Sequence, residues 1–253
     1  MIVMDLDATL LNDEKNISSY NLSILEKCKN IGIKIAIATA RSEKEADRVV
    51  KLLKPDFMIL NGGGLVLNKK GRILYEKLLP ADISDRIIAK CINNKNIGII
   101  TVDTKNGYFL NYKEPAWHPD FMNGVYNDFS VPLSQEIYKI VLELYNDEIA
   151  KEIQNEYPET SLIKFSGENW YGISHREAKK MLAIEAIAKE ENILTENIIA
   201  FGDDFNDMEM IEKCGIGIAM GNAIDEIKNI AKHICGNNND NGIGKWIEAN
   251  IFR

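Results

Sequence analysis

Short apolar runs that alternate with amphipathic segments occupy the two ends of the chain. A run that is apolar throughout is typical of a strand buried on both faces of a parallel sheet. Such runs cover residues 2–4, 33–38, 57–60, 198–201 and 215–220. The segments between the runs have helical spacing, so strand, helix and strand follow one another as in βαβ units. This pattern predicts a doubly wound α/β sheet.

The clearest helix signal follows Ser42. Ser42 has Glu45 three residues later, which is a capping-box sequence at a helix start. The apolar residues that follow lie on one helical stripe, at Ala46, Val49, Val50 and Leu53. Residues 182–187 and 224–231 show comparable helical patterns.

The middle of the chain has a different composition of elements. The spacing predicts helices at 82–95, 134–145 and 148–157, with paired strands at 97–102 and 108–112 and a closing pair at 162–165 and 170–173 around Gly167. We therefore expect an α/β fold with a doubly wound, Rossmann-like parallel-sheet core at 1–80 and 176–253. An inserted α+β cap domain at 81–175 would interrupt it.

Polar side chains collect where the predicted parallel strands end. They are Asp5, Asp7, Thr39, Asn61, Asp203, Asp204, Asn206 and Asp207. Ligands of open α/β sheets bind beyond the carboxyl ends of the strands. Several carboxylates at one edge repel each other, and a hard cation such as Mg²⁺ would relieve this repulsion. In Asp5-Leu6-Asp7, one carboxylate could act as a nucleophile and the other as a proton shuttle.

These stretches resemble the motifs of the haloacid-dehalogenase-like phosphatases. DLDATLL (5–11) resembles the first motif, DxDGT, and IATAR (37–41) resembles the second. GDDFND (202–207) resembles the fourth, and LNGG (60–63) resembles a segment common in the Cof-type subfamily. The motifs run in order along the whole chain, and the predicted insertion lies where this subfamily carries a large α/β cap. The resemblance therefore identifies a Cof-type phosphatase.

The third motif of this family needs a lysine, for which Lys179 and Lys180 are both candidates. In the subfamily that the chain resembles, this lysine follows the last cap strand by a short turn and opens a helix that ends in a Gly-Ile-like pair. Counted on that pattern, back from Asn192-Ile193 and forward from Ile173, the resemblance favours Lys180, and the helix pattern agrees that Lys180 lies in a first turn. We choose Lys180 and keep Lys179 as the alternative.

The resemblance implies a role for each matched residue. Asp5 would be the nucleophile that forms an aspartyl-phosphate, and Asp7 the acid and base. Thr39 and Lys180 would hold the phosphoryl oxygens. Mg²⁺ would be bound by Asp5, by the carbonyl of Asp7 and by Asp203. Asp207 would be a further metal residue, either as a ligand or by orienting the metal shell or Lys180. Substrate-binding residues would be Thr39, Ala40, Arg41, Lys180 and Asn206, with a surface salt bridge as the alternative for Arg41.

Two residues depart from the family pattern. Ala8 and Ala40 stand where the family usually has glycine, a residue that allows positive φ or close backbone approach. We expect these methyl groups to lower the rate or shift the substrate, without removing a reacting group.

Composition narrows the set of partners. The 253 residues are 45% hydrophobic and carry a net charge of −8, and Lys and Arg occur together only in short pairs. We therefore expect a small phosphorylated metabolite as the partner, and neither nucleic acid nor a membrane. The four cysteines form no CxxC pair and the N-terminus shows no leader sequence, so we expect the cytoplasm. Monomer and homodimer both stay open.

Two other functions remain as alternatives to a phosphatase. A phosphomutase would pass the phosphoryl group between sugar hydroxyls, and a catalytically weak module would only bind phosphate ligands. In each case the cap would choose the substrate. Within the cap we interpret Trp117-His118-Pro119 as core packing, with a substrate contact as the alternative.

Overall fold

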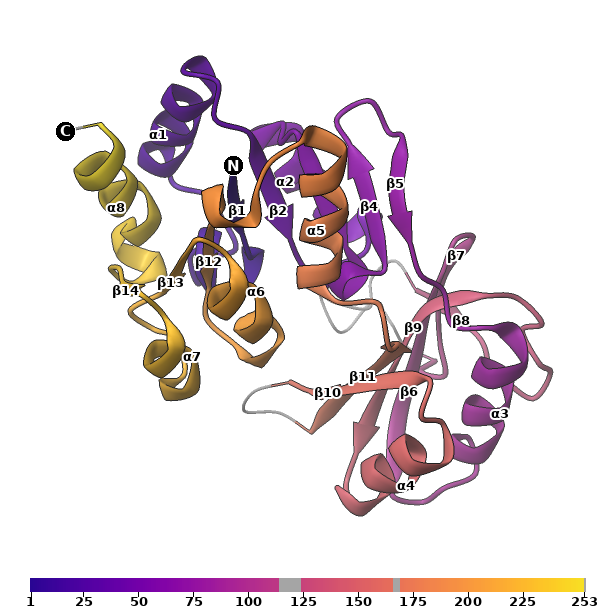
Figure 1. Cartoon of the computed structure of the whole chain (residues 1–253). Coiled ribbons are helices and arrows are strands. Elements are labelled where there is room, and N and C mark those ends of the chain that lie inside the picture. The colour runs from indigo at the N-terminus through magenta and orange to yellow at the C-terminus, as the bar shows by residue number, and fades with distance from the viewer. Residues whose placement is uncertain (114–123, 166–168, 253) are drawn as a thin grey trace. The chain divides into compact units, whose positions relative to one another are not determined.

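The computed structural model describes residues 1–113, 124–165 and 169–252, so the Trp117-His118-Pro119 segment and Gly167 lie outside the described residues. The chain divides into two compact units (Figure 1). The first is Met1–Glu76 with Lys179–Arg253, and the second is Lys77–Ala178. The second unit begins and ends a few residues outside the expected range of 81–175.

The first unit is built on a sheet with the order β14-β13-β12-β1-β2-β3-β4-β5. Its strands are β1 (Ile2–Met4), β2 (Ile35–Ala38), β3 (Phe57–Leu60), β4 (Leu65–Asn68), β5 (Ile73–Glu76), β12 (Ile199–Gly202), β13 (Ile216–Ala219) and β14 (His233–Ile234). Neighbours from β14 to β3 are parallel, and β4 and β5 add an antiparallel edge. The predicted parallel-sheet core is confirmed.

Helices alternate with these strands along the chain. They are α1 (Ser19–Asn30), α2 (Glu43–Leu53), α5 (Lys180–Glu191), α6 (Met208–Lys213), α7 (Asp225–Ile230) and α8 (Gly242–Ile251). The predicted capping box at α2 is confirmed, because Ser42 accepts from the Glu45 N–H and the Glu45 carboxylate accepts from the Ser42 N–H. Ala46, Val49 and Leu53 on the predicted stripe are buried.

In the part of the second unit that the structure describes, a sheet of order β10-β11-β9-β6-β7-β8 is paired with two α-helices. The strands are β6 (Ile97–Thr104), β7 (Gly107–Leu110), β8 (Val125–Tyr126), β9 (Ile137–Leu144), β10 (Thr160–Lys164) and β11 (Trp170–His175), and the helices are α3 (Ala81–Cys91) and α4 (Glu148–Glu156). Ile87 of α3 and Ile153 of α4 share one buried cluster with Val102 and Leu142 of the sheet. This unit therefore has a hydrophobic core of its own.

The helix predicted at 134–145 is wrong, since residues 137–144 form strand β9. Ile137, Ile140 and Leu144 match helical spacing, whereas Ile140, Leu142 and Leu144 also match the two-residue period of a strand. β9 pairs with β6 on one side and β11 on the other. A central strand is buried enough to hide its alternation, so tertiary pairing decided between two patterns that the sequence allows.

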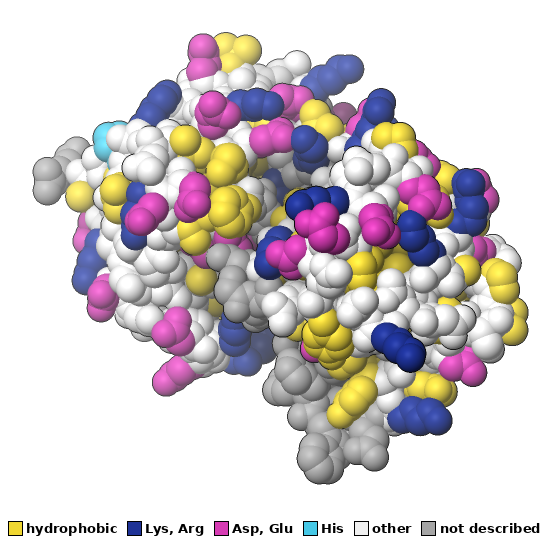
Figure 2. Space-filling view, turned by 90° about the horizontal axis from the view of Figure 1, so that it is seen from below, with side chains coloured by type: hydrophobic (Ala, Val, Ile, Leu, Met, Phe, Trp, Pro, Cys, Tyr) yellow, Lys and Arg dark blue, Asp and Glu magenta, His cyan; other side chains and the backbone are white. Residues whose placement is uncertain are grey.

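Charged side chains of both signs are interspersed on the face drawn in Figure 2. Charged side chains form ion pairs at the surface, as Lys51 with Asp47 and Arg86 with Asp82 do one helical turn apart. Among the described residues, we find no helix with both the length and the apolar character needed to cross a membrane.

Candidate active site

The acidic residues of the first and fourth motifs converge at the carboxyl edge of the first unit's sheet. Asp5 directly follows β1, and its N–H donates to the carbonyl of Phe201 in the neighbouring parallel strand β12 at 3.1 Å. Because the two strands run in the same direction, Asp5 and Asp203 leave them at the same edge. Carboxylate oxygens of Asp5, Asp203 and Asp207 lie within 4.8 Å of one another.

Lys180 lies in the centre of this acidic group. Its Nζ donates to Asp207 Oδ1 at 2.6 Å, to Asp5 Oδ1 at 2.7 Å and to Asn206 Oδ1 at 3.1 Å, and the residue is only 3% exposed. The helix α5 begins at Lys180, which places this side chain in the first turn. Lys179 instead forms an ion pair with Glu209 at 2.6 Å on a partly exposed surface. Of the two candidates, Lys180 is thus the lysine that contacts Asp5.

Negative charge in the cluster exceeds the positive charge of Lys180. Burial, together with the charges of Asp207 and Asp203, raises the pKa of Asp5 well above its usual value despite the opposing effect of Lys180. Burial and the Asp207 charge likewise raise the pKa of Asp203 to about 7. A further cation beside Asp5 and Asp203 would stabilise both ionised carboxylates. Clustered carboxylate oxygens are hard ligands, so the donor set fits a divalent cation such as Mg²⁺.

Asp207 has hydrogen-bond partners on both of its carboxylate oxygens. Oδ1 accepts from Lys180, and Oδ2 accepts from the backbone N–H groups of Asp203 at 2.9 Å and Asp204 at 3.3 Å. The side chain is fully buried. Asp207 therefore fixes the loop after β12 and holds Lys180 in place. Asp204 accepts from the Phe205 N–H as the cap of a short helical turn.

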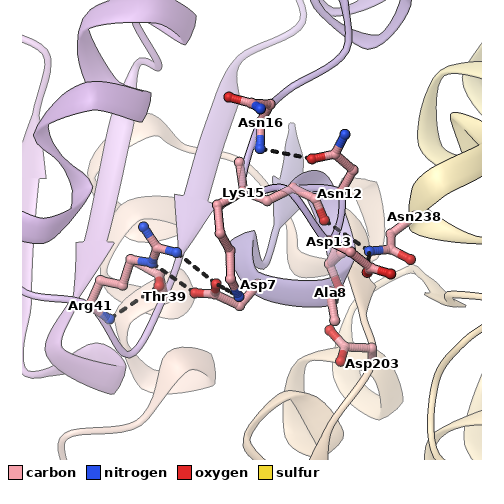
Figure 3. A network of polar contacts seen from close by, with 12 residues as sticks. Asp7, Ala8, Asn12, Asp13, Lys15, Asn16, Thr39, Arg41, Asp203 and Asn238 are labelled. Atoms are coloured by element: carbon pink, nitrogen blue, oxygen red, sulfur yellow. Dashed lines mark hydrogen bonds and ion pairs between the residues drawn. The ribbon is translucent and has the colours of Figure 1, made fainter. Parts of the chain in front are cut away.

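Asp7 belongs to a second network, formed with Arg41 and Lys15 (Figure 3). Arg41 donates from Nε to Asp7 Oδ2 at 2.8 Å and from its terminal nitrogen to Oδ1 at 2.7 Å, and Lys15 Nζ donates to Oδ1 at 2.8 Å. Burial alone would raise the pKa of Asp7, but these cationic partners outweigh burial and lower it. The Asp7 carboxylate is directed toward Arg41, whereas the Asp203 carboxylate accepts a hydrogen bond from the Thr9 hydroxyl.

Thr39 lies at the end of β2, the neighbour of β1 on its other side. It is 1% exposed, and its Oγ1 accepts from the Arg41 N–H at 3.1 Å. Ala40 lies between these two residues and is half-buried. The second motif thus borders Asp7 through Arg41 and lies at the same sheet edge as Asp5.

The first motif contains a residue in the left-handed region. Ala8 has φ +55° and ψ 7°, a conformation that glycine adopts without steric cost. Its carbonyl accepts from Asn222 Nδ2 at 2.7 Å. The methyl group therefore coexists with the motif's turn at a conformational cost.

Sequence reasoning did not select three residues that shape the site. Thr9 donates its hydroxyl to Asp203, Lys15 binds Asp7, and Asn222 binds the Ala8 carbonyl. Thr9 could have been found, because it belongs to the DxDGT-like motif, and Asn222 follows an apolar run as the other strand-end residues do. Lys15 carries no comparable signal, since it lies in a polar loop.

Comparison with known proteins shows the family to which the chain belongs. Residues 2–247 match the family model of haloacid dehalogenase-like hydrolases. The chain belongs to the haloacid dehalogenase-like hydrolase family. This confirms the Cof-type resemblance predicted from the motifs, and with it a phosphatase as the class of enzyme.

Relatives within the haloacid dehalogenase-like hydrolases align over nearly their whole length. The 5-amino-6-(5-phospho-D-ribitylamino)uracil phosphatases YitU and YcsE of Bacillus subtilis are both 26% identical to this chain, cover 98% of it, and are themselves covered to 96% and 94%. The structure of SMU.1108c from Streptococcus mutans has a TM-score of 0.87 at 20% identity, covering 100% of this chain and 98% of its own. The HAD subclass IIB sugar phosphatase BT4131 has a TM-score of 0.83 at 21% identity, covering 98% and 97%.

Proposed function

We propose that this protein hydrolyses a small phosphate monoester, a sugar phosphate or similar metabolite, through a phosphoryl group carried on Asp5 and with Mg²⁺ bound. The observation that carries the proposal is the position of Lys180, a buried ammonium bonded to Asp5 beside the Asp203 carboxylate. Phosphoryl transfer depends mainly on positioning and on neutralising the phosphoryl oxygens. A fixed cation next to a carboxylate nucleophile supplies both.

The Asp5 and Asp203 carboxylates, with the Asp7 carbonyl, would hold the Mg²⁺ ion. When bound, Mg²⁺ supplies positive charge that offsets the phosphoryl oxygens and the clustered carboxylates. The oxygens of Asp207 already accept hydrogen bonds from Lys180 and two N–H groups, so we assign Asp207 to orienting Lys180 and the loop that carries Asp203.

In the first step an Asp5 oxygen forms a bond to phosphorus while the ester P–O bond breaks. Asp7 gives its proton to the departing alkoxide, which leaves as an alcohol. In the second step Asp7 takes a proton from water, the water oxygen attacks phosphorus, and the bond to Asp5 breaks to release inorganic phosphate. Thr39, Lys180 and Asn206 hold the phosphoryl oxygens during both steps.

Arg41 connects substrate binding to the proton on Asp7. Asp7 must carry a proton in the first step, yet its contact with Arg41 favours the ionised form. A phosphoryl dianion competes with the Asp7 carboxylate for the Arg41 guanidinium, because each anion can accept charge-assisted hydrogen bonds from it. Substrate binding therefore draws Arg41 from Asp7 and lets Asp7 hold its proton. Ala40, between Thr39 and Arg41, borders the same phosphoryl group.

The names of relatives guide the choice of substrates. YitU acts on 5-amino-6-(5-phospho-D-ribitylamino)uracil by its name, and BT4131 is named a sugar phosphatase. We assign substrate choice to the second unit, residues 77–178, as cap domain, and catalysis to the first. We place the protein in the cytoplasm, consistent with the buried free thiols of Cys28, Cys91 and Cys214.

The proposal is tested by phosphate release from a panel of monoesters, with Mg²⁺ and with a chelator. The panel includes sugar phosphates, phosphoglycolate, pyridoxal phosphate, flavin mononucleotide and the phosphoribitylaminouracil. We expect release from at least one ester, loss with the chelator, and loss in Asp5→Asn. The control is Asp13→Asn, which removes a nearby carboxylate bonded to Asn238 and Asn239 and should leave turnover intact. Release by Asp5→Asn at the wild-type rate would contradict the proposal. Release only with a sugar bisphosphate primer would indicate a phosphomutase.

A further inference from the structure

We propose that the turn Asn61-Gly62-Gly63 is a positioning element for Lys180, and that Gly63 is the residue that sets where the Lys180 ammonium stands. This inference rests on the proposed function, since it assigns Lys180 to the transferring phosphoryl group. The turn follows β3 and is separated from Lys180 by more than a hundred residues along the chain. It touches no reacting atom in the proposed steps, so it acts only through its neighbours.

The turn is attached on one side to the loop that carries Thr39. The Asn61 N–H donates to the Arg41 carbonyl at 2.9 Å, and the Gly62 N–H donates to the Thr39 carbonyl at 2.9 Å. Backbone hydrogen bonds of this kind leave the turn little freedom to shift relative to the second motif. The position of the turn is therefore tied to the position of Thr39.

On its other side the turn lies against the start of α5. A Cβ built on Gly63 would lie 2.2 Å from the carbonyl carbon of Lys179, 2.4 Å from its oxygen and 2.7 Å from the nitrogen of Lys180. These are backbone atoms, so no side-chain rotation can make room. The Lys179 carbonyl is also the acceptor for the Ala183 N–H at 3.1 Å, in the first turn of the helix. A methyl group on Gly63 must push the helix start or the turn itself.

Asn61 has two features that are unfavourable when considered alone, a positive φ and a buried acceptor without a partner among the described residues. Asn61 has φ +51°, Gly62 +68° and Gly63 +106°. Asn61 Oδ1 is buried and has no hydrogen-bond partner in the part of the chain that the structure describes. Left-handed backbone and an orphaned buried acceptor persist where the surroundings hold them. Here the surroundings are the Thr39 loop and the start of α5, and the turn fixes the position of one relative to the other.

Small displacements of Lys180 matter because its contacts are short. Its Nζ makes three hydrogen bonds between 2.6 and 3.1 Å, to Asp207, Asp5 and Asn206. A shift of about 1 Å at a reacting centre can lower a rate about a hundredfold. Moving the start of α5 by part of that distance would draw the ammonium away from Asp5 and from the phosphoryl oxygens together.

Gly62 offers a matched control one residue away. Both glycines have positive φ, so alanine at either position introduces backbone strain: at Gly62 the value of +68° lies in the left-handed region open to alanine, and at Gly63 the value of +106° lies beyond it, so the strain is larger there. A Cβ on Gly62 would meet nothing within 4 Å, whereas a Cβ on Gly63 meets the Lys179 backbone. The two variants therefore differ in whether they push the helix that carries Lys180, and the Lys180 Nζ to Asp5 Oδ1 distance separates that push from the larger backbone strain at Gly63.

The test compares Gly63→Ala and Gly62→Ala in the full chain. We expect kcat of Gly63→Ala to fall by about tenfold to a hundredfold, with a much smaller change in KM, while Gly62→Ala loses far less. Crystal structures of both variants should show a longer Lys180 Nζ to Asp5 Oδ1 distance in Gly63→Ala alone. Urea unfolding at the assay temperature verifies that both variants are folded.

Equal kcat values in the two folded variants, or an unchanged Lys180–Asp5 distance in Gly63→Ala, would overturn the inference. Absence of phosphate release by the wild-type protein would instead contradict the proposed function. The two crystal structures would still decide whether Gly63 positions Lys180, so the two failures are distinguishable.

Discussion

Two charged networks lie at the same sheet edge and differ in their exposure to water. In the Lys180 network the side chains of Lys180, Asp5 and Asp207 are 2%, 9% and 0% exposed. In the Asp7 network the side chains of Asp7, Arg41 and Lys15 are 41%, 25% and 61% exposed. The hydrogen-bond distances are nearly the same in both networks. What differs is the cost of breaking them.

The difference in exposure distinguishes residues that are held in place from residues that can change their partner. A buried charge that loses its partner has no water to replace it, so Lys180 and Asp207 stay where the fold puts them. An exposed ion pair is worth little, because water and salt compete with it. Under the proposed function, Arg41 can therefore leave Asp7 for a phosphoryl group, while Lys180 stays beside Asp5 and Asp207.

Replacing Lys180 should have the largest effect. Lys180→Met leaves the buried carboxylates of Asp5 and Asp207 without their cation, and we expect it to lower the free energy of unfolding by about 3–5 kcal/mol and to abolish phosphate release. The control is Lys179→Met, whose ion pair with Glu209 is partly exposed and should be worth below about 1 kcal/mol. Urea unfolding measures both variants. Equal stability of the two variants would contradict the claim that the buried Lys180 network costs more to break than an exposed ion pair.

Replacing Arg41 should affect activity more than stability. Arg41→Met removes a charge-assisted contact to the phosphoryl group, and we expect kcat/KM to fall about tenfold. The free energy of unfolding should change by less than about 1 kcal/mol, since its pair with Asp7 is partly exposed. Steady-state kinetics and urea unfolding on the same preparation provide the two values. A stability loss as large as that of Lys180→Met would show that the Asp7 network is structural.

Ala8 joins the two networks, because Asp7 precedes it and Thr9, which binds Asp203, follows it. Ala8→Gly removes the left-handed strain at φ +55° and should raise the free energy of unfolding by about 1 kcal/mol. Thermal or urea unfolding is the measurement. A loss of stability would mean that the alanine methyl contributes packing that exceeds its backbone cost.

Replacing Asp56 should have the smallest effect on stability. Its ion pair with Lys69 lies outside the site and serves as a reference for the two networks. Burial would raise its pKa, but hydrogen bonds from Lys69 and the Ile35 N–H outweigh burial and lower it. A lowered folded-state pKa means stability that is present above the unfolded-state value of about 3.9 and is lost as pH falls below it. The stability gap between wild type and Asp56→Asn should therefore shrink in acid. A gap that stays constant from neutral pH to acid would refute this.

The sequence predicts the sheet edge better than the networks on it. Apolar runs that end in Asp5, Thr39 and Asp203 suffice to bring these residues to one edge, because parallel strands end together. Lys180 could be chosen over Lys179 by its spacing in the motif pattern of the resembled subfamily, with which its place in a helix agrees. The pairing of Asp7 with Arg41 depends on side-chain rotamers, which strand and helix patterns do not contain.

The second unit shows the same limit at the level of elements. Residues 137–144 fit a helix and a strand equally, and their position between β6 and β11 decides for a strand. Alanine is an unusual residue at position 8 of the family motif, and the sequence shows this, but the left-handed backbone of Ala8 is seen only in the structure. Hydrophobic periodicity identifies a helix or strand when only one of the two patterns fits. Where both patterns fit, the neighbouring strands in the fold decide between them.

The most direct test of the account is chemical trapping of the phosphoryl group on Asp5. Wild-type protein is mixed with a turned-over ester whose phosphate is radiolabelled, quenched in acid and digested with trypsin. We predict label in the peptide of residues 1–15, released by hydroxylamine as an acyl phosphate, and none in Asp5→Asn. Label on another residue, or rapid turnover with no labelled peptide, would contradict Asp5 as the nucleophile.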